Sequence, residues 1–541
     1  MEPREWHKQY PGEIPPSFEY PHFTMKQYFN ESARRYPNRP FLVFHDAVIT
    51  FEEANAFARK LANGLMAQGC KKRDRVVIAA NNIPEFVIAI QACYKFGGIA
   101  VPTNPRYTTR ELEYILKDSQ AETIIIIDTM LKKVLEVCGG GQVAIKRIVV
   151  ISEQKIELTV QQGAGCVDLL SYDEVVFNGE STEPAVEVFS NDCALLQYTG
   201  GTTGIPKGCV LTQSNLEATV FGWFSWYTHP LASDEYPVIL CPVPLYHIYG
   251  LVGNISLANY AGGTILLMDS LAADDVLCTL AKHPPNLLCV VPYALIFLLN
   301  HPAFPYIDIS SIKVIGVGGD SLPKGVSTEL ERITGKRAVV GYGLTETAGS
   351  VCGQPIGVEA KEGSIGLPLP DVDARIMSLE DPGTEVPCGQ LGELVVKGPQ
   401  VMTGYWGQPE ETALVLKDGW LSTGDIGYRD KEGWIFLKDR KKDMIIHSGF
   451  NVYPKEIDEV LSAHPAIQDA CTIGIPSTEK GETVKSFIVL NPGEKLSAEE
   501  VMDYCHRYLV GYKVPKVVEF IDQLPKTAVG KPNRVALRQR S

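Results

Sequence analysis

Short apolar runs recur along the first two-thirds of the chain and are separated by polar segments of helical length. This alternation predicts βαβ units around largely parallel sheets. The segment Thr50-Phe-Glu-Glu53 is a capping box that predicts the start of an amphipathic helix, and 84–96 reads as a second helix. The predicted strands are 75–80, 99–102, 122–128, 147–151, 238–240, 264–268 and 313–317.

The pattern changes near Gly366, where strands become short and are separated by Gly, Pro and Asp. Strands at 373–377, 392–396 and 434–437 indicate a small β-rich subdomain. The charged segment 439–443 is interpreted as a solvated connector, and a compact region of about 100 residues follows it. There we expect helices near Pro454 and after the capping box at Ser497, with a strand at 484–490 between them.

Composition supports a multidomain globular protein. The chain has 541 residues, more than one hydrophobic core usually supports, and 45% of them are hydrophobic. The net charge of −14 argues against a nucleic-acid surface as the main partner. The 13 cysteines are scattered without a Cys-x-x-Cys pair, which favours a reduced, cytoplasmic protein over a disulfide framework or zinc site.

No segment has the character of a membrane span or a secretory signal. The N-terminal residues are polar and lack an apolar stretch. The most apolar run, 287–299, is too short to cross a bilayer and contains Pro292, so it is interpreted as a buried strand that leads into a helix. Weak membrane-surface association and homodimer formation stay open.

The first candidate site is the glycine-rich segment Tyr198-Thr-Gly-Gly-Thr-Thr-Gly-Ile-Pro-Lys-Gly208. Glycine backbone N–H groups can approach an anion closely, threonine hydroxyls add donors, and Lys207 adds a positive charge. This combination predicts a polyphosphate grip, although it lacks the Gly-Lys-Ser/Thr order of a Walker A loop. A plain glycine-rich surface loop is the alternative. The residues assigned to the grip are Thr199, Gly200, Gly201, Thr202, Thr203, Gly204 and Lys207.

A second motif, Gly341-Tyr-Gly-Leu-Thr-Glu-Thr347, combines an aromatic face with a carboxylate. Tyr342 could stack on a purine, Thr345 could bond a phosphate oxygen, and Glu346 could hold Mg²⁺. A tight turn with a surface glutamate fits the same residues. Gly341 and Gly343 flank the tyrosine.

Three further segments contain candidate site residues. Gly319 and Asp320 come after a predicted strand and could lie against an adenine, or simply form a strand-to-helix turn. In Ser422-Thr-Gly-Asp425 the aspartate follows a predicted turn and could bind ribose hydroxyls, although aspartate is common in turns. Lys531 follows a glycine near the C-terminus and is expected on an exposed loop.

Together and in this order, these motifs resemble those of the adenylate-forming superfamily of acyl-CoA synthetases, adenylation domains and luciferases. The resemblance covers nearly the whole chain and is strongest to bacterial long-chain fatty-acid–CoA ligases. Segments that support it include Pro244-Leu-Tyr-His-Ile-Tyr-Gly250 and Lys438-Asp-Arg-Lys-Lys-Asp-Met-Ile445. It implies an α/β fold: a large N-terminal domain with parallel-type sheets and a β-rich subdomain (1–438), a hinge (439–443) and a small, mobile α+β C-terminal domain (444–541).

The resemblance implies a two-step reaction with ATP, Mg²⁺ and coenzyme A. A carboxylate attacks the α-phosphate to give acyl-AMP and pyrophosphate, and the thiol of CoA then displaces AMP. Thr199 and Glu346 would lie near Mg²⁺, and Gly319, Asp320 and Tyr342 would border the adenine. Asp425 and Arg440 would hold the ribose.

The remaining implied roles concern the acyl group and the hinge. Lys531 would bridge the substrate carboxylate and the α-phosphate. His247 would border the acyl pocket as a gate, not as a general base, whereas by itself it reads as a core histidine. Lys442 would be the hinge, and Ser448, Gly449 and Phe450 would form the pantetheine channel in the second pose.

Four interpretations compete at this stage. The leading one is a fatty acyl-CoA synthetase. An aryl- or branched-acid–CoA ligase differs from it in the acyl pocket alone, and acyl transfer to a separate carrier protein is a further alternative. The fourth, from another class, is a non-catalytic nucleotide-binding protein. Pro532, Ile446 and Leu251 depart from the family pattern.

Overall fold

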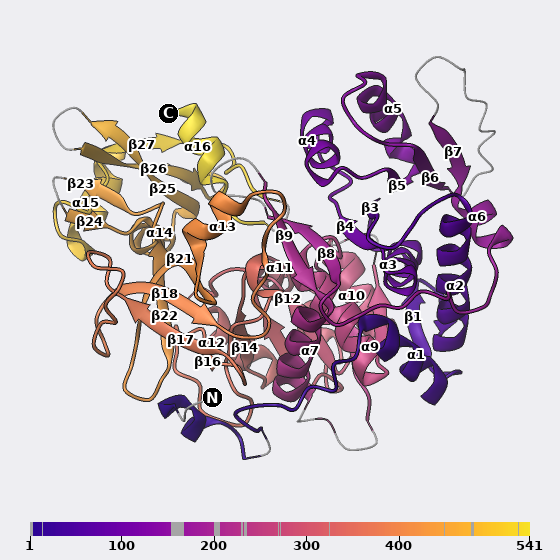
Figure 1. Cartoon of the computed structure of the whole chain (residues 1–541). Coiled ribbons are helices and arrows are strands. Elements are labelled where there is room, and N and C mark those ends of the chain that lie inside the picture. The colour runs from indigo at the N-terminus through magenta and orange to yellow at the C-terminus, as the bar shows by residue number, and fades with distance from the viewer. Residues whose placement is uncertain are drawn as a thin grey trace.

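The structure is a computed structural model that describes residues 4–12, 14–152, 167–199, 206–228, 231, 235–268, 270, 272–323, 325–447, 450–477, 481–527 and 530–541. Its strands form four sheets (Figure 1). Strands and helices alternate through the first two-thirds of the chain, as the hydrophobic pattern predicts.

One large sheet is built mostly from the first 200 residues, in the order β19-β9-β8-β4-β3-β5-β6-β7. The strands from β8 to β7 run parallel, and β9 and β19 add an antiparallel edge. Its strands are β3 (Arg75–Ala79), β4 (Ile99–Pro102), β5 (Thr123–Ile127), β6 (Arg147–Ile151), β7 (Asp168–Ser171), β8 (Cys193–Tyr198), β9 (Gly208–Thr212) and β19 (Gly404–Tyr405). The helices of this part are α2 (Phe51–Ala67), α3 (Pro84–Phe96), α4 (Thr109–Ser119), η2 (Asp128–Met130), α5 (Leu131–Gly139) and α6 (Tyr172–Asn178).

Local sequence explains where these helices begin. Thr50 and Glu53 form the predicted capping box at the start of α2, with each side chain bonded to the other's backbone N–H. Pro84 occupies the first turn of α3, where its missing N–H costs nothing. Gly97 ends α3 in the left-handed conformation at φ 69°. Both predicted helices are therefore confirmed.

The second large sheet has the order β16-β15-β14-β13-β12-β10-β11-β1-β2 and is parallel from β14 to β1. Its strands are β1 (Pro40–Phe44), β2 (Ala47–Thr50), β10 (Val238–Leu240), β11 (Thr264–Leu267), β12 (Leu287–Val290), β13 (Val314–Val317), β14 (Ala338–Tyr342), β15 (Cys352–Gly353) and β16 (Leu367–Pro368). Its helices are α1 (Met25–Arg35), α7 (Gln213–Thr228), α8 (Ile248–Gly250), the π-helix η3 (Leu251–Ser256), α9 (Leu257–Ala261), α10 (Ala273–Lys282), α11 (Pro292–Asn300), η4 (Phe304–Tyr306), α12 (Val326–Thr334) and η5 (Thr345–Thr347).

The β-rich part forms an antiparallel sheet of its own, as predicted. Its elements are β17 (Asp373–Met377), β18 (Gly392–Lys397), α13 (Pro409–Val415), β20 (Leu416–Lys417), β21 (Trp420–Arg429) and β22 (Ile435–Arg440). Two expectations are corrected here. Asp425 lies inside β21, not after a turn, and the segment expected as a connector from 439 is still strand to Arg440 because β22 continues to pair with β21.

The last hundred residues form the fourth sheet, at the upper left of Figure 1. Its elements are β23 (Ile445–His447), β24 (Phe450–Val452), α14 (Pro454–Ser462), β25 (Ile467–Ser477), β26 (Gly481–Leu490), α15 (Ala498–Tyr508), β27 (Val517–Phe520) and α16 (Arg534–Arg540). Their buried side chains form hydrophobic clusters separate from the main core, which extends across the other sheets. The predicted boundary near Asp439 and the hinge stay predictions.

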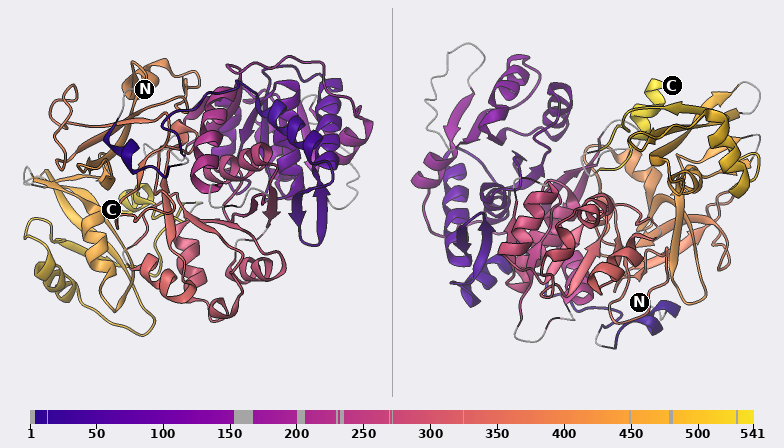
Figure 2. Two further views of the ribbon diagram at one scale, coloured as in Figure 1. Left: turned by 90° about the horizontal axis from the view of Figure 1, so that it is seen from below. Right: turned by 180° about the vertical axis from the view of Figure 1, so that it is seen from behind.

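The N-terminal segment lies beside the β-rich sheet, as both panels of Figure 2 show. η1 (Glu5–Gln9) buries Trp6 in a cluster with Leu367 and Trp434. Arg4 pairs with Asp373, and the Tyr10 hydroxyl donates to the Pro368 carbonyl. These contacts attach the start of the chain to residues at and beside the β-rich sheet that lie more than 350 positions later in the sequence.

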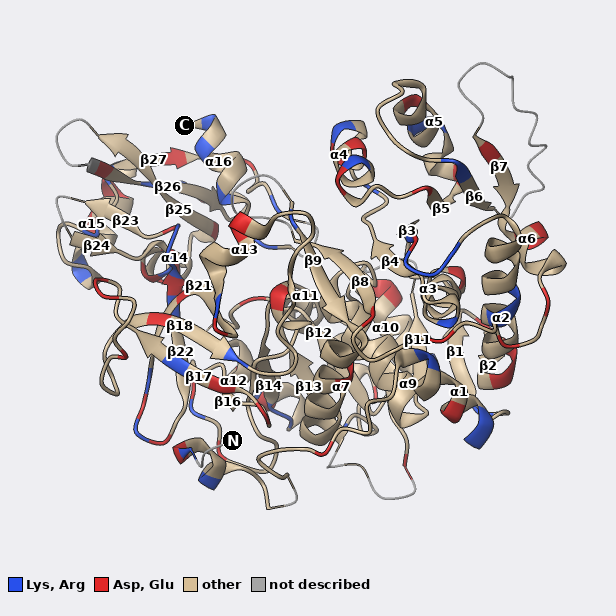
Figure 3. Ribbon diagram, in the orientation of Figure 1, with Lys and Arg blue, Asp and Glu red and all other residues tan. Residues whose placement is uncertain are grey.

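Among the described residues, no helix combines the length and apolarity needed to cross a membrane. The described cysteines are free thiols. Figure 3 shows acidic and basic residues interspersed along the ribbon.

Candidate active site

The predicted phosphate grip lies between two antiparallel strands, β8 and β9. Thr199 follows β8, Lys207 precedes β9, and the Thr199 N–H donates to the Lys207 carbonyl at 3.0 Å. This bond closes the base of the loop. The predicted residues Gly200, Gly201, Thr202, Thr203 and Gly204 lie outside the described residues.

A charged chain joins Lys207 to Glu346, the predicted Mg²⁺ ligand. The Lys207 ammonium pairs with Glu411 on α13 and lies 5.1 Å from the centre of the Tyr405 ring. The Tyr405 hydroxyl donates to Glu346 Oε1 at 2.8 Å. Glu346 lies in η5, where its carbonyl accepts from the Met402 N–H. The structure therefore brings the predicted phosphate cation and the predicted metal ligand into one network.

The donor set suits Mg²⁺ that arrives with a nucleotide. Within the described residues, no cluster of three or more His, Cys, Asp or Glu side chains could hold a metal ion. Magnesium is commonly bound by one or two carboxylates together with phosphate oxygens and water. A single carboxylate at Glu346, with the hydroxyl of Thr199 as the second predicted ligand, fits that mode of binding. Thr345 begins η5 next to Glu346.

The predicted ribose site is a triad of polar side chains, in which Asp425 is buried and Tyr342 and Arg440 are half-buried. Asp425 and Arg440 are paired residues of β21 and β22, and Arg440 Nε contacts Asp425 Oδ1 at 2.7 Å. The Tyr342 hydroxyl donates to Asp425 Oδ2 at 2.5 Å. Burial raises the pKa of Asp425, while Arg440 and Tyr342 act in the opposite direction. Each carboxylate oxygen keeps lone pairs that could accept from ribose hydroxyls.

A small pocket of about 40 Å³ adjoins this triad. Gly341 and Gly343 line it at positions where a side chain would collide, since an added Cβ would lie 2.6 Å from the Tyr227 hydroxyl oxygen and 2.1 Å from the Gly349 carbonyl oxygen, respectively. Gly319 also lines the pocket, in the left-handed conformation at φ 88°. Asp320 is exposed, does not line the pocket, and accepts from the Ser321 N–H at 2.7 Å. The complete lining is Trp223, Tyr227, His247, Ile248, Tyr249, Val317, Gly318, Gly319, Gly341, Tyr342, Gly343 and Gly349.

His247 faces this pocket from the N-terminal cap of α8, where Nδ1 accepts from the Tyr249 N–H at 3.3 Å. Burial, together with the nearby charge of Lys531, lowers the pKa of His247 to about 4. The imidazole is therefore neutral at pH 7. A base this weak is poorly matched to proton abstraction at neutral pH.

Lys531 lies close enough to His247 and Asp425 for its positive charge to lower the pKa of both groups. It is half-buried, which corrects the expectation of an exposed loop. A turn holds it: the Lys531 N–H donates to Thr527 Oγ1 at 3.2 Å, and its carbonyl accepts from the Thr527 N–H at 2.8 Å. Gly530 packs against Tyr293 of α11.

Neither Lys442, the predicted hinge, nor Phe450, of the predicted thiol channel, lines the pocket. Lys442 is exposed in the turn between β22 and β23, and its neighbour Asp443 pairs with Arg538 of α16 at 2.8 Å. Phe450 is 53% exposed and stacks on Tyr512, with ring centres 4.5 Å apart. Ser448 and Gly449 lie outside the described residues.

Sequence reasoning missed Tyr405 and Glu411, which contact two predicted site residues. It also missed Tyr293, which contacts the Lys531 turn. These residues come from segments without a glycine-rich or charged motif that would single them out. Trp223 and Tyr227, from the aromatic run 221–227, line the pocket, whereas Trp226 is buried in the core and donates to the Gln354 carbonyl.

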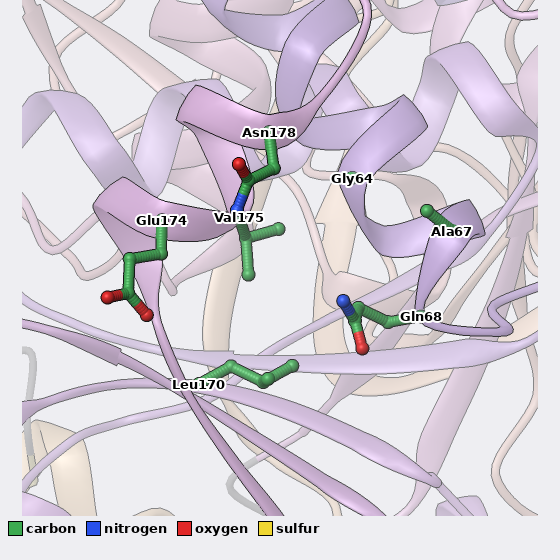
Figure 4. A pocket seen from close by; sticks show the side chains of 7 residues that line it. All are labelled: Gly64, Ala67, Gln68, Leu170, Glu174, Val175 and Asn178. Carbon is green, nitrogen blue, oxygen red and sulfur yellow. The ribbon is translucent and has the colours of Figure 1, made fainter.

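A second hollow, of about 100 Å³, lies between α2 and α6 (Figure 4). Gly64 and Ala67 of α2 and the following Gln68 face α6, with Leu170 of β7 below them. None of the predicted site residues lines this hollow.

Comparison with known proteins identifies both parts of the chain. The sequence profile of AMP-binding enzymes matches residues 29–406, and that of the AMP-binding enzyme C-terminal domain matches residues 456–531. A long-chain-fatty-acid–CoA ligase of Bacillus subtilis is 38% identical over 98% of this chain and 96% of its own length. A feruloyl-CoA synthase of Amycolatopsis is 33% identical over 94% and 97%, respectively.

Solved structures agree with this assignment. An anthranilate–CoA ligase in complex with anthranoyl-AMP superposes with a TM-score of 0.86 at 26% identity, covering 98% of both chains. The ATP-bound MatB of Rhodopseudomonas palustris gives a TM-score of 0.85 at 26% identity over 96% of this chain and 99% of that one. Both neighbours have the predicted fold.

Proposed function

Because the chain belongs to the family of AMP-binding enzymes, we propose that it is an AMP-forming acid–CoA ligase that activates fatty acids. In the first step the carboxylate of the acid attacks the α-phosphate of ATP, which forms acyl-AMP and releases pyrophosphate. In the second step the thiol of coenzyme A attacks the acyl carbon, which forms the thioester and releases AMP.

One observation carries this proposal. The charge of Lys531 reaches the pocket, which the neutral His247 lines and the Tyr342–Asp425–Arg440 triad adjoins. The site thus combines a ribose-type acceptor, a cation for developing negative charge and an apolar hollow for a carboxylic acid. The first half-reaction needs this combination.

Each residue then has a distinct role. Asp425 would accept from the ribose hydroxyls, and Tyr342 with Gly341 and Gly343 would border the base. Lys207 and Thr199 would bind the outer phosphates, and Mg²⁺ held near Glu346 would offset their charge. Lys531 would stabilise the charge that builds on the α-phosphate during attack, a contribution that preorganised cations commonly make.

Fatty acids are favoured as substrates by similarity to the curated relatives, which are named for long-chain fatty acids at 38% identity over nearly the whole chain. The pocket has room for only a few waters, so an alkyl chain would require movement of Trp223, Tyr227 or Tyr249. Aryl acids are the second candidate, favoured by the 33% identity to the feruloyl-CoA synthase. Acyl transfer to a carrier protein is less favoured.

The decisive experiment incubates the purified chain with ATP, MgCl₂, CoA and single acids from hexanoic to stearic, with benzoic, cinnamic and ferulic acids in parallel. We expect acid-dependent release of AMP and formation of an acyl-CoA, with the highest kcat/KM among the fatty acids. Folded protein that releases no AMP with any acid would refute a ligase activity. A preference for ferulic acid would select the aryl alternative.

The non-catalytic alternative makes the opposite prediction for Lys531. If the chain only bound nucleotides, Lys531→Ala would not change the amounts of AMP and acyl-CoA measured in this assay. Size measurement by light scattering would test homodimer formation, and fractionation of cells would test the predicted cytoplasmic location.

A further inference from the structure

We infer that Tyr405 and Glu411 are positioning residues for ATP binding, which together hold Lys207 and Glu346 in place for the triphosphate and its Mg²⁺. The inference rests on the proposed function, because it assigns the phosphates to that end of the site. Both residues come from one short segment that the motif analysis did not single out. Neither needs to touch the nucleotide, since each acts through a neighbouring side chain.

The segment is fixed to the strand that follows Lys207. β19 pairs with β9, with Gly404 opposite Val210 and Tyr405 opposite Cys209. The Trp406 N–H donates to the Gly208 carbonyl at 2.8 Å. Tyr405 is therefore attached to the same backbone that presents Lys207, and α13 packs against β19.

The segment also fixes the position of Glu411. Thr412 Oγ1 accepts from the Tyr405 N–H at 2.9 Å and donates to the Gln408 carbonyl at 2.8 Å. These bonds attach the start of α13 to β19. Glu411, next in sequence to Thr412, thereby points its carboxylate at the Lys207 ammonium.

The resulting contacts orient the two charged groups at the phosphate end. Lys207 is held between the Glu411 carboxylate and the face of the Tyr405 ring. The hydroxyl of the same ring donates to Glu346 Oε1 at 2.8 Å. An ammonium has three donors, so pairing with Glu411 leaves donors for phosphate oxygens. A free lysine side chain would lose more rotamer entropy on binding ATP, and the pairing reduces that loss.

Two effects of Glu411 oppose each other. Its negative charge repels the triphosphate, while its contact with Lys207 orients the cation. The Glu411 side chain is 45% exposed and that of Lys207 is 20% exposed. Solvent and salt weaken the longer-range repulsion more than the direct contact, so the orienting effect is expected to dominate.

The test compares Glu411→Gln with Glu410→Gln by calorimetric titration of ATP and AMP. Glu410 is the preceding residue of α13 and is exposed. We expect Glu411→Gln to raise the Kd for MgATP about three- to ten-fold. The Kd for AMP, which lacks the outer phosphates, should not change, and Glu410→Gln should match the wild type for both ligands.

A double-variant comparison tests whether Glu411 acts through Lys207. In a Lys207→Ala background, Glu411→Gln should have no further effect on the Kd for MgATP. An equal effect with and without Lys207 would overturn the inference. Unchanged or tighter MgATP binding by Glu411→Gln alone would also overturn it, and tighter binding would show that Glu411 competes with the phosphates for the lysine.

Tyr405→Phe tests the contact with Glu346. The variant keeps the ring under Lys207 and removes the hydroxyl, so the gain in ATP affinity on adding MgCl₂ should shrink several-fold. An unchanged gain would remove Tyr405 from the inference. These titrations need no acid or CoA, so they are separate from the test of ligase activity, which fails by absence of acid-dependent AMP release.

Discussion

At the level of single residues, the neutrality of His247 decides which chemistry it can perform. Desolvation by the surrounding protein and the positive charge of nearby Lys531 both lower the pKa of His247, to about 4. A histidine of this kind can accept a hydrogen bond from an incoming group or rotate aside, but at pH 7 it carries no charge to offset a carboxylate. Charge stabilisation therefore falls to Lys531.

The same pKa shift predicts a pH-dependent cost to stability. The unfolded chain protonates His247 below its ordinary pKa of 6.5, whereas the folded protein protonates it only near pH 4. Proton uptake therefore favours unfolding as the pH falls from 6.5 to 4. Between pH 7 and pH 5 this contributes a loss of about 2 kcal/mol. In urea titrations at pH 7 and pH 5, the unfolding free energy of His247→Gln should fall by about 2 kcal/mol less than that of the wild type. An equal fall in both proteins would contradict a lowered pKa at His247.

The position of Lys531 predicts a split between the two half-reactions. Lys531→Ala should lower the rate of acyl-AMP formation by about 10²- to 10³-fold, because one preorganised charge is removed from the transition state. Thioester formation from synthetic acyl-AMP should change little. Lys495→Ala, at an exposed position of the same region, serves as the control. Pyrophosphate exchange and acyl-AMP turnover measure the two steps separately, and equal losses in both would contradict the role.

At the residue scale, the sequence singled out site residues that belong to a recognisable motif. Tyr342, from one motif, contacts Asp425, from another, while the roles of Tyr342 and Glu346 in nucleotide and Mg²⁺ binding stay predictions. Glu411 could not be found in this way, because its partner Lys207 lies 204 residues earlier and nothing local marks the pairing. The half-buried position of Lys531 likewise depends on packing of its turn against Tyr293.

At the level of elements, local signals predicted boundaries best. The capping boxes at Thr50 and Ser497 mark the starts of α2 and α15 because each satisfies backbone N–H groups that the helix leaves free. Strand ends were harder to predict. β22 continues to Arg440 because pairing with β21 supplies partners that the charged sequence does not reveal. Tertiary pairing, not propensity, decided that boundary.

The N-terminal segment provides a prediction at the element scale. Trp6 is fully buried in its cluster with Leu367 and Trp434, so Trp6→Ala should leave a cavity and cost about 3 to 5 kcal/mol of unfolding free energy. Lys8→Ala, in the same 3₁₀ helix but exposed, should cost less than about 0.5 kcal/mol. Urea titrations of both variants measure the difference, and similar stabilities would show that the segment is not integral to the β-rich sheet.

At the level of the whole molecule, a few contacts set the position of the C-terminal sheet over the rest. Lys455 of α14 donates to Ser321 Oγ at 2.7 Å, and Lys526 lies 4.3 Å from the centre of the Tyr293 ring. Gly530 packs on the same tyrosine. These polar and aromatic contacts are exposed or half-buried, and interactions of this kind are individually weak. We propose that this arrangement is the pose in which Lys531 serves the first step.

Weak contacts of this kind predict that the pose is adjustable. Lys455→Ala and Ser321→Ala should each slow acyl-AMP formation by at most about five-fold, because each removes a bond worth about 1 kcal/mol or less. Thioester formation from synthetic acyl-AMP should not slow. The double variant should be no worse than either single variant, since both remove the same bond. Fluorescence resonance energy transfer between labels on α11 and α15 should show that fewer molecules of each variant than of the wild type hold the two helices close together. Additive losses, or slowing of both steps, would show that these residues support folding instead of the pose.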